Sequence, residues 1–339
     1  MAVTIVTYNS RRYIGACLEA VLEQTGVPYE VVVVDNDSAD STRQILARFG
    51  DRIRVIHNAR NVGFAAAQNQ AIAATTSDWV LTLNPDALVG LGFLQRLVEA
   101  GEIDSKVGSV CGKLLSIGPD FTPYEQPRID STGIYFTPSI RHFDRGWGVA
   151  DEGQFENMEY VFGASAAAAL YRRSMIEDVS DAAGFFDPDF FAYREDADVA
   201  WRAQLLGWRA LYTPSAWAYH VRSAIPGHRL AVPAVLNMHS VKNRFLMRVK
   251  NMTAGVYRRC WFQATARDVV VMAACLICEQ SSLPAFWEFT KCLPRAVRRR
   301  REIMRRRRVT DDVLALWFAG QPSFPLAVEA QAQFDRMAV

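Results

Sequence analysis

The first third of the chain alternates short apolar runs with amphipathic stretches. The apolar runs at residues 2–9, 30–35, 52–58, 79–86 and 107–114 predict buried strands, because a strand covered on both faces has no polar side. Residues 14–24, 38–50, 63–74 and 91–101 repeat apolar positions at helical spacing. Ser38 or Asp40 is expected to cap the second helix. Strands that alternate with helices predict an α/β fold with a doubly wound, mostly parallel sheet.

The pattern changes twice farther along the chain. Between residues 116 and 159, proline, glycine and aromatic residues replace the alternation, which predicts an excursion beside a ligand site. Residues 163–176 predict a compact small-residue segment that becomes helical, and residues 210–221 predict a strand. Beyond Pro233 the pattern is helical, basic and amphipathic to the last residue. We therefore predict an α/β domain over residues 1–225 and a helical C-terminal region over residues 226–339.

Adjacent acids follow an aromatic loop in residues 185–208. Glu195, Asp196 and Asp198 fall in the first turn of a predicted helix that ends at Gly207. Its inner face is expected to carry Val199, Ala203 and Leu206. The helix dipole favours the ionised form of a first-turn carboxylate, as a general base requires. Taken alone, the segment is more simply interpreted as a well-capped helix.

Polar side chains also follow four of the predicted strands. They occupy residues 7–9, 35–38, 58–63 and 84–86. Each group alone is ordinary turn chemistry, but four at one sheet edge indicate a polar ligand, since such sheets bind ligands beyond the carboxyl ends of their strands. Asp86 suits a divalent cation that shares phosphate oxygens with its ligand. The chain has no GxxxxGK[ST] motif and no GxGxxG after the first strand, which argues against a P-loop NTPase and a dinucleotide dehydrogenase.

Charge and cysteine placement add to this picture. The net charge of +2 conceals nine arginines and one glutamate between Pro294 and Arg308. Aromatic residues near this run favour a lipid surface over nucleic acid, while an acidic groove on a partner protein is a third option. No apolar run reaches the roughly 20 residues of a membrane span. The six cysteines form no disulfide framework, and Cys275 and Cys278 are interpreted as core residues, so a cytoplasmic protein is expected.

The motifs, in their order along the chain, resemble family 2 glycosyltransferases with the GT-A fold. They are VTIVTYNS, VVVVDNDSADST, RNVGFAAAQNQAI, LNPDA, GASAAAALYRRSM and GFFDPDFFAYREDADVAWR, followed by His220. Within that family they are most similar to the bacterial rhamnosyltransferase-like branch, which transfers deoxysugars onto cell-envelope glycans. The resemblance covers roughly residues 2–225. Each motif alone is weak, whereas the ordered set is specific.

The resemblance implies a role for each matching residue. Asp196 matches the catalytic base, with Glu195 beside it, whereas Asp198 and Arg202 are expected to pair within the helix. The donor-binding positions are Thr7, Tyr8, Asn9, Asp35, Asp37, Arg60, Asn61, Gly63, Asn69, Asn84 and Asp86. The positions near the donor sugar and acceptor are Gly163, Ala164 and Trp201. Asp86 and His220 match residues that hold Mg²⁺ or Mn²⁺, although Asn84 replaces the first acid of the usual DxD motif.

The implied activity is inverting transfer from a nucleotide-diphospho-sugar to a hydroxyl of a lipid-linked or cell-envelope glycan. L-rhamnose from dTDP-rhamnose is the expected donor; a UDP-hexose or another dTDP-deoxysugar is the alternative. A catalytically silent sugar-nucleotide-binding scaffold at the membrane is an alternative of another class. The protein is expected on the inner face of the cell membrane, attached peripherally through its basic C-terminal region to anionic lipid, with no nucleic-acid partner. The oligomeric state stays open.

Overall fold

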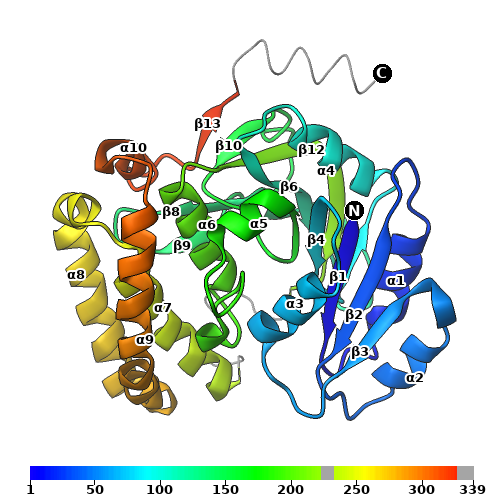
Figure 1. Cartoon of the computed structure of the whole chain (residues 1–339), viewed down its shortest axis with the longest axis horizontal. Coiled ribbons are helices and arrows are strands. Elements are labelled where there is room, and N and C mark those ends of the chain that lie inside the picture. The colour runs from blue at the N-terminus through cyan, green and yellow to red at the C-terminus, as the bar shows by residue number, and fades with distance from the viewer. Residues whose placement is uncertain (223–232, 327–339) are drawn as a thin grey trace.

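The computed structural model describes residues 1–222 and 233–326. Within them, an 11-stranded mixed sheet forms the centre of the molecule (Figure 1). Four parallel strands form one half, in the order β4 (Trp79–Leu83), β1 (Ala2–Thr7), β2 (Glu30–Asp35) and β3 (Arg54–His57). This half confirms the mostly parallel, doubly wound arrangement that the alternating pattern predicts.

The other half of the sheet is mixed. Antiparallel β11 (Ala168–Arg172) joins β4 to β6 (Val107–Ser116), which pairs in parallel with β12 (Arg209–His220). Antiparallel β10 (Glu159–Val161) and β13 (Ser323–Pro325) complete the edge. β5 (Ala87–Val89) and β7 (Ile129–Ser131) pair with β12 and β6, while β8 (Ile134–Phe136) and β9 (His142–Asp144) form a separate hairpin.

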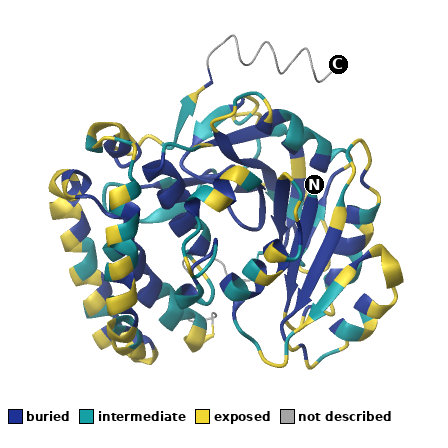
Figure 2. Cartoon of the chain, in the orientation of Figure 1, coloured by how far each residue is buried: buried dark blue, intermediate teal, exposed yellow. Residues whose placement is uncertain are grey.

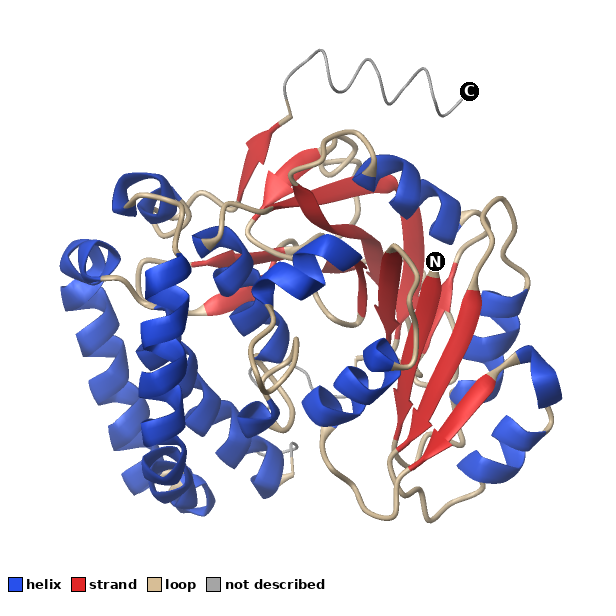
Figure 3. Cartoon of the chain, in the orientation of Figure 1, coloured by secondary structure: helices blue, strands red, loops and turns tan. Residues whose placement is uncertain are grey.

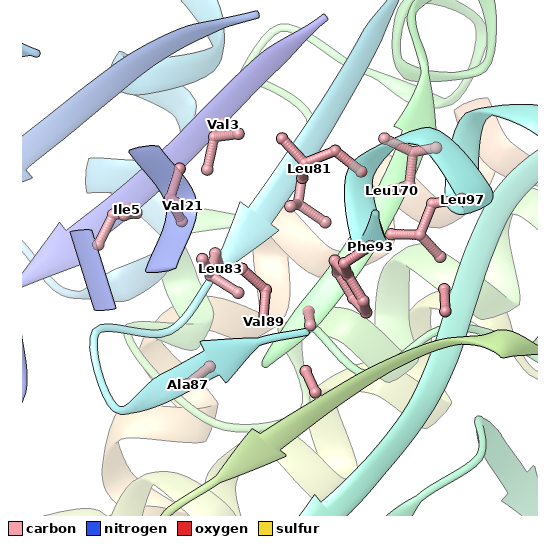
Figure 4. Packing of buried hydrophobic residues seen from close by; sticks show 14 of the residues in the cluster. Val3, Ile5, Val21, Leu81, Leu83, Ala87, Val89, Phe93, Leu97 and Leu170 are labelled. Carbon is pink, nitrogen blue, oxygen red and sulfur yellow. The ribbon is translucent and has the colours of Figure 1, made fainter. Parts of the chain in front are cut away.

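Helices cover both faces of the sheet, as Figure 3 shows. One face carries α1 (Ile14–Leu22), α2 (Thr42–Ala47) and α4 (Phe93–Gly101); the other carries α3 (Phe64–Ala73), α5 (Arg173–Val179) and α6 (Glu195–Leu205). Side chains alternate along each strand, so Val3 and Ile5 of β1 pack toward α1 and α4, whereas Val6 packs toward α3. Figure 4 shows the first of these clusters.

Several local expectations need correction. The N-cap of α2 is Ser41 and makes no side-chain cap bond; instead Asp40 accepts a hydrogen bond from the amide of Thr42, and the Ser38 hydroxyl accepts one from the amide of Asn9. Residues 163–176 contain β11 before their helix, because the apolar residues 168–171 fill a central place in the sheet. The expected irregular excursion contains three short strands, β7 to β9.

The C-terminal region packs against the α/β domain. Helices α7 (Ala234–Asn251), α8 (Ala254–Ile277) and α9 (Pro284–Arg306) stand together at the left of Figure 1, followed by α10 (Asp311–Leu316). A buried aromatic cluster joins Phe136, Phe162 and Trp201 of the α/β domain to Trp317 and Phe318. The chain then adds β13 to the sheet, which corrects the expectation of helix to the last residue. The predicted boundary near residue 225 lies outside the described residues.

Helix α8 departs from two expectations. By length and composition it is apolar enough to cross a membrane, and 22% of its most apolar window is buried. The expectation of no segment of that length is therefore wrong for this helix, because its 24 residues combine several shorter apolar runs. Cys275 is buried as expected, whereas Cys278 at the end of the helix is exposed.

Candidate donor and catalytic site

The parallel strands bring all four predicted polar groups to one edge of the sheet. In the β1–β2–β3 register, Thr7 lies opposite Asp35, and Asp35 lies opposite His57. β4 is parallel to β1, so Asn84 and Asp86 follow at the same edge. This is the lower edge of the sheet in Figure 1. The predicted juxtaposition of the strand ends is confirmed.

Asp35 is fully buried at the centre of this edge. Its carboxylate accepts hydrogen bonds from the Thr7 hydroxyl at 3.2 Å and from Arg43 Nε at 2.6 Å. Burial opposes ionisation, but hydrogen bonds from Ser38 and Arg43 hold the pKa of Asp35 below its ordinary value. Asp35 is therefore a fixed anion at neutral pH. Sequence reasoning missed Arg43, although its place on α2, after the strand that ends in Asp35, is a usable signal.

Four further residues of the first three strand ends carry no bond to Asp35. Tyr8 is half exposed, Asn9 and Asp37 have left-handed backbone conformations with φ of 52° and 65°, and the amide of Asn9 is held by Ser38. Arg60 is exposed. Within the described residues, the Asp35 carboxylate accepts instead from Thr7, Ser38 and Arg43.

The loop at the third strand end packs against the loop that precedes α6. Asn61 Oδ1 accepts hydrogen bonds from Asn36 Nδ2 at 2.8 Å and from the amide of Gly63 at 2.9 Å. Gly63 has φ of +86°, and a Cβ there would lie 2.5 Å from the Phe191 ring. The close approach explains the glycine. Asn36, which belongs to the second predicted polar group but was given no role of its own, ties the two strand ends together.

Asn69 does not face the donor region. Its side-chain amide donates to the carbonyl of Phe186 at 2.7 Å and accepts from the amide of Phe186 at 2.9 Å. Both polar atoms therefore bind backbone of the loop before α6. We correct its assignment from donor contact to a residue that fixes this loop.

Asp86 and His220 meet where β4 ends and β12 ends. His220 Nε2 lies 3.4 Å from Asp86 and 3.3 Å from Asn84 Nδ2, and its Nδ1 lies 2.8 Å from the buried Asp130. Burial lowers the basicity of the ring, but the charge and hydrogen bond of Asp130, with the hydrogen bond to Asp86, raise the pKa of His220 to about 10. Arg222 makes paired hydrogen bonds to Asp130 at 2.7 and 3.3 Å. Neither Asp130 nor Arg222 was found from the sequence.

This cluster offers few metal donors of its own. Among the described residues no group of three histidine, cysteine or acidic side chains could hold a metal ion. One carboxylate and one imidazole fit only a cation that takes further oxygens from a bound diphosphate, as Mg²⁺ and Mn²⁺ do. Asp130 supplies the outer hydrogen bond that usually orients a metal-binding histidine. The donor chemistry therefore fits a cation shared with substrate.

Asp196 stands at the start of α6, partly exposed, in an environment that disfavours its charge. Its oxygens accept hydrogen bonds from the amides of Ala197 at 2.7 Å and Ala166 at 3.3 Å. Burial and the charge of Asp144 nevertheless raise the pKa of Asp196 to about 6. The expected dipole effect is thus outweighed, yet the carboxylate is ionised above that pH. A base with this pKa is well matched to proton abstraction near neutrality.

Glu195 differs from its neighbour. It is buried and its Oε2 has no hydrogen-bond partner among the described residues. Burial and the charge of Asp196 hold the pKa of Glu195 well above its ordinary value. Of the two adjacent acids, Asp196 is the one that can carry charge at neutral pH.

The residues predicted near the acceptor sugar are packed into the protein. A Cβ on Gly163 would lie 2.2 Å from Cβ of Ala200, which fixes the β10–β11 loop against α6. Ala164 is buried, and Trp201 is fully buried in the aromatic cluster with Phe136. We correct Trp201 from an acceptor contact to a core residue, because its ring points into the apolar interior. Phe185, Phe186 and Phe190 of the aromatic loop are likewise buried.

A buried ion network anchors α6 to the C-terminal region. Arg202 Nε donates to Asp198 at 2.9 Å, which confirms the predicted pairing. Lys250 of α7, almost fully buried, lies 2.8 Å from Asp198 and 2.6 Å from Asp187. Asn251 Nδ2 donates to Asp198 at 2.8 Å. Lys250 could not be assigned to this network from sequence pattern, because its partners lie more than fifty positions away.

Helix α7 also holds the backbone just before α6. Phe191, Tyr193 and Arg194 all have positive φ, between 65° and 71°, which is costly for residues with side chains. Buried Asn243 donates to three carbonyl oxygens there, at 2.7 to 2.9 Å; they belong to Phe190, Ala192 and Tyr193. The C-terminal region therefore determines the entry into α6.

The arginine run of α9 forms ion pairs within the molecule. Arg295 pairs with Asp189, Arg299 with Asp181, Asp187 and Asp189, and both Arg306 and Arg308 with Asp178. These acids belong to the segment that leads into α6. Part of the predicted membrane-binding charge therefore neutralises acids of the segment before α6 instead.

Comparison with known proteins agrees with this geometry. The family model for glycosyl transferase family 2 matches residues 2–180. The chain belongs to this family. A curated relative of this glycosyltransferase is N-acetylglucosaminyl-diphospho-decaprenol L-rhamnosyltransferase of Mycobacterium tuberculosis, 28% identical over 244 residues, which covers 67% of this chain and 78% of the relative.

Solved structures share the fold of this family 2 glycosyltransferase. GalNAc-T7 with UDP, GalNAc and Mn²⁺ aligns with a TM-score of 0.56 and 15% identity over 74% of this chain, which spans 47% of that longer chain. The mannosyltransferase PcManGT of Pyrobaculum calidifontis, in complex with GDP-Man and Mn²⁺, aligns with a TM-score of 0.51 and 18% identity, covering 93% of this chain and 86% of the other. The GT-A-like fold expected from the sequence is confirmed.

Proposed function

We propose that this glycosyltransferase moves a sugar from a nucleotide-diphospho-sugar to a hydroxyl of a lipid-linked glycan, with inversion at the anomeric carbon. The observation that carries the proposal is the position of Asp196, a partly exposed carboxylate with a pKa of about 6 that accepts a hydrogen bond from the amide of Ala166. The carbonyl of the next residue, Ala167, accepts one from the amide of Asn84 at the end of β4, so the carboxylate lies beside that strand end. The name of the mycobacterial relative supports a lipid-linked acceptor. Cell-envelope glycan synthesis is the process that this acceptor implies.

L-rhamnose from dTDP-rhamnose is the donor we propose, because the same relative is an L-rhamnosyltransferase. Asp35, held as an anion by Thr7 and Arg43, is suited to accept a hydrogen bond from the ring N–H of a pyrimidine base. A UDP-hexose or another dTDP-deoxysugar would satisfy the same carboxylate and is the alternative donor.

Asp86 and His220 are the residues we propose for Mg²⁺ or Mn²⁺, with the diphosphate oxygens of the donor as further ligands. When bound, the cation stabilises negative charge on the leaving diphosphate. Binding of the cation through His220 requires the neutral imidazole, whereas Asp130 and Asp86 favour the protonated ring. Mn²⁺ in the structurally similar mannosyltransferase supports a metal in this fold.

The chemical step we propose uses one base. Asp196 accepts the proton of the acceptor hydroxyl, whose oxygen attacks the anomeric carbon from the face opposite the diphosphate. The new C–O bond forms as the bond to the diphosphate oxygen breaks, so a single displacement inverts the anomeric configuration. A second carboxylate nucleophile is not required, and Glu195, buried and disfavoured as an anion, contributes no negative charge near the reacting atoms.

Replacing the base tests the proposal. Asp196→Asn is expected to lower kcat by about 100- to 10,000-fold, the range typical of a general base. Donor affinity, measured by calorimetry on the same preparation, should stay within about threefold of the wild-type value. The reason is that Asp196 is proposed to contact the acceptor hydroxyl and not the donor. Full retention of transfer by the variant would overturn the assignment of the base. Donor binding by the wild type without turnover of any lipid-linked glycan would instead support the silent scaffold.

Donor identity and metal use can be tested through stability. A ligand that binds only the folded state raises Tm, so dTDP-rhamnose with Mn²⁺ should shift the melting curve more than UDP-hexoses do. Asp86→Asn should remove the Mn²⁺-dependent part of that shift and leave the metal-independent part. A clear shift with UDP-sugars and none with dTDP-sugars would rule out the proposed donor.

The cytoplasmic face of the cell membrane is the location that a lipid-linked acceptor requires. Anionic lipid remains a proposed partner of the basic C-terminal region. Its exposed arginines include Arg298, Arg301 and Arg305, which join no ion pair formed within the described residues.

A further inference from the structure

Helix α8 presents an apolar and uncharged face to solvent. This outer α8 face consists of side chains that are each at least 40% exposed: Trp261, Phe262, Val269, Val270, Met272, Leu276 and Ile277. The charged residues within the same stretch, Arg267 and Asp268, are only partly exposed, and Asp268 pairs with Arg244 and Arg248 of α7. Figure 2 shows exposed residues along the outer side of α8.

The opposite side of α8 is already used for packing. Cys260, Ala264, Val271 and Cys275 are buried against the other C-terminal helices. Helix α8 therefore has apolar side chains all around, which is unusual for a helix on the surface of a soluble domain. At a rise of about 1.5 Å per residue the outer α8 face is roughly 25 Å long, and a continuous apolar patch of that length marks an interaction site.

The chemistry of this face fits lipid better than protein. Interfaces between protein chains carry about one hydrogen bond per 100–200 Å². Between Trp261 and Ile277 the exposed polar side chains are Gln263 and Thr265 alone. The acyl chains of a bilayer form no hydrogen bonds, and they pack against mixed aliphatic and aromatic side chains of this kind.

Aromatic and basic residues border the outer α8 face. Arg258 and Arg259 are exposed on the turn before Trp261. Past the other end of α8, Trp287 on α9 is 66% exposed, and Lys291 lies over its ring at 5.4 Å. Tryptophan and cationic side chains at the edge of an apolar face are typical of helices that lie in the headgroup region of a membrane.

We propose that the outer α8 face inserts into one leaflet of a lipid bilayer, with α8 parallel to the membrane plane. Packing of its other side against the C-terminal helices prevents α8 from crossing the bilayer as it stands. The inference rests on the proposed function only in that a lipid-linked acceptor places the enzyme at a membrane. It differs from the electrostatic attachment expected from the arginine run, since four of those arginines pair with Asp178, Asp181, Asp187 and Asp189.

Vesicle binding of the full chain tests the proposal. The wild type should sediment with zwitterionic phosphatidylcholine vesicles in both low and high salt, because apolar insertion does not depend on counterions. The triple variant Phe262→Ser, Leu276→Ser and Ile277→Ser should lower the partition coefficient by about 100-fold. Leu91→Ser is the matched control, since Leu91 is 78% exposed just before α4. In Figure 1, α4 lies at the upper right of the centre, whereas α8 lies at the left edge. The Leu91→Ser variant should bind like the wild type.

Three results would overturn the proposal. One is unchanged vesicle binding by the triple variant. The second is binding that high salt or Arg298→Gln, Arg301→Gln and Arg305→Gln abolish. The third is a wild-type dimer in sedimentation velocity that the triple variant dissociates, without vesicle binding by either.

Transfer to a short-chain, water-soluble acceptor separates this inference from the proposed function. The triple variant should transfer sugar to that acceptor at the wild-type rate. Loss of donor-induced stabilisation in the variant would show misfolding, and single substitutions at Leu276 and Ile277 would then replace the triple variant. Wild type that binds vesicles yet transfers no sugar would refute the function and leave the membrane surface intact.

Discussion

Asp196 illustrates a conflict between activity and stability at the scale of one residue. A base must be charged when it accepts a proton, but burial and Asp144 make that charge unfavourable in the folded protein. The folded state therefore holds the proton more tightly than the unfolded chain does, since the pKa rises from 3.8 to about 6. Protonation of Asp196 therefore stabilises the folded state. This contribution is fully present below the unfolded pKa and is lost as pH rises through 6.

Asn at position 196 should therefore stabilise the protein at alkaline pH. Near pH 8, Asp196→Asn is expected to raise the free energy of unfolding by about 1–3 kcal/mol, because it removes the disfavoured charge. The gain should shrink as pH falls toward 5. Urea unfolding at a series of pH values measures it. A pH-independent difference between variant and wild type would contradict the raised pKa.

The wild-type rate should show the matching dependence. We expect kcat/KM to rise with pH through an apparent pKa near 6, as Asp196 loses its proton. Steady-state rates with a soluble acceptor, below and above that pH, would measure the acid limb. A flat profile across this range would mean that another group takes the proton.

Helix α6 is held in place by partners from elements far away in the sequence. Lys250 lies between Asp187 and Asp198, and Asn243 binds the carbonyl oxygens of the preceding turn. Although burial opposes ionisation, the charges of Lys250 and Arg299 hold the pKa of Asp187 far below its ordinary value. The anions on and beside α6 therefore depend on cations from α7 and α9.

Removing the buried cation should be costly. Lys250→Met is expected to lower the free energy of unfolding by about 3–5 kcal/mol, because it leaves buried carboxylates without their partner. Lys291→Met is the matched control: Lys291 is exposed on α9, and among the described residues it contacts Glu288 and the exposed ring of Trp287, so its loss should cost less than about 0.5 kcal/mol. Urea denaturation of both variants gives the comparison. Equal costs would show that the buried network adds little.

The sequence predicted features that depend on local pattern. The strand ends that carry Asp35 and Asp86 follow from apolar runs, and the Asp198–Arg202 pair follows from helical spacing. It did not predict Asp130, Lys250 or Asn243, because their partners lie at least fifty positions away and no periodicity marks them. It also misjudged Trp201: an aromatic residue beside catalytic acids can face either a ligand or the core, and only packing decides between them.

At the scale of the whole molecule, the two predicted regions share one core. Trp317 and Phe318 pack on Phe162 and Phe136, and β13 extends the sheet of the α/β domain. The sequence pattern therefore changes near the predicted boundary at residue 225, but the regions on its two sides pack into the same core.

A chain that ends at residue 222 should not fold as a stable domain. The truncation would expose Phe136, Phe162 and Trp201 and leave Asp187 and Asp198 without Lys250. We expect an aggregated product without the near-UV circular dichroism of the full chain. A soluble, cooperative and donor-binding fragment would contradict this and would establish residues 1–222 as an independent domain.

The shared aromatic cluster has a consequence for synthesis of the protein. Trp201 leaves the ribosome well before Phe318. At a translation rate of about 5–20 residues per second, the delay between the two residues is roughly 10 s. Throughout it, Phe136 and Phe162 lack the side chains that will cover them. The nascent enzyme is thus expected to depend on chaperones during this interval, and it cannot become active until translation has passed its C-terminal helices.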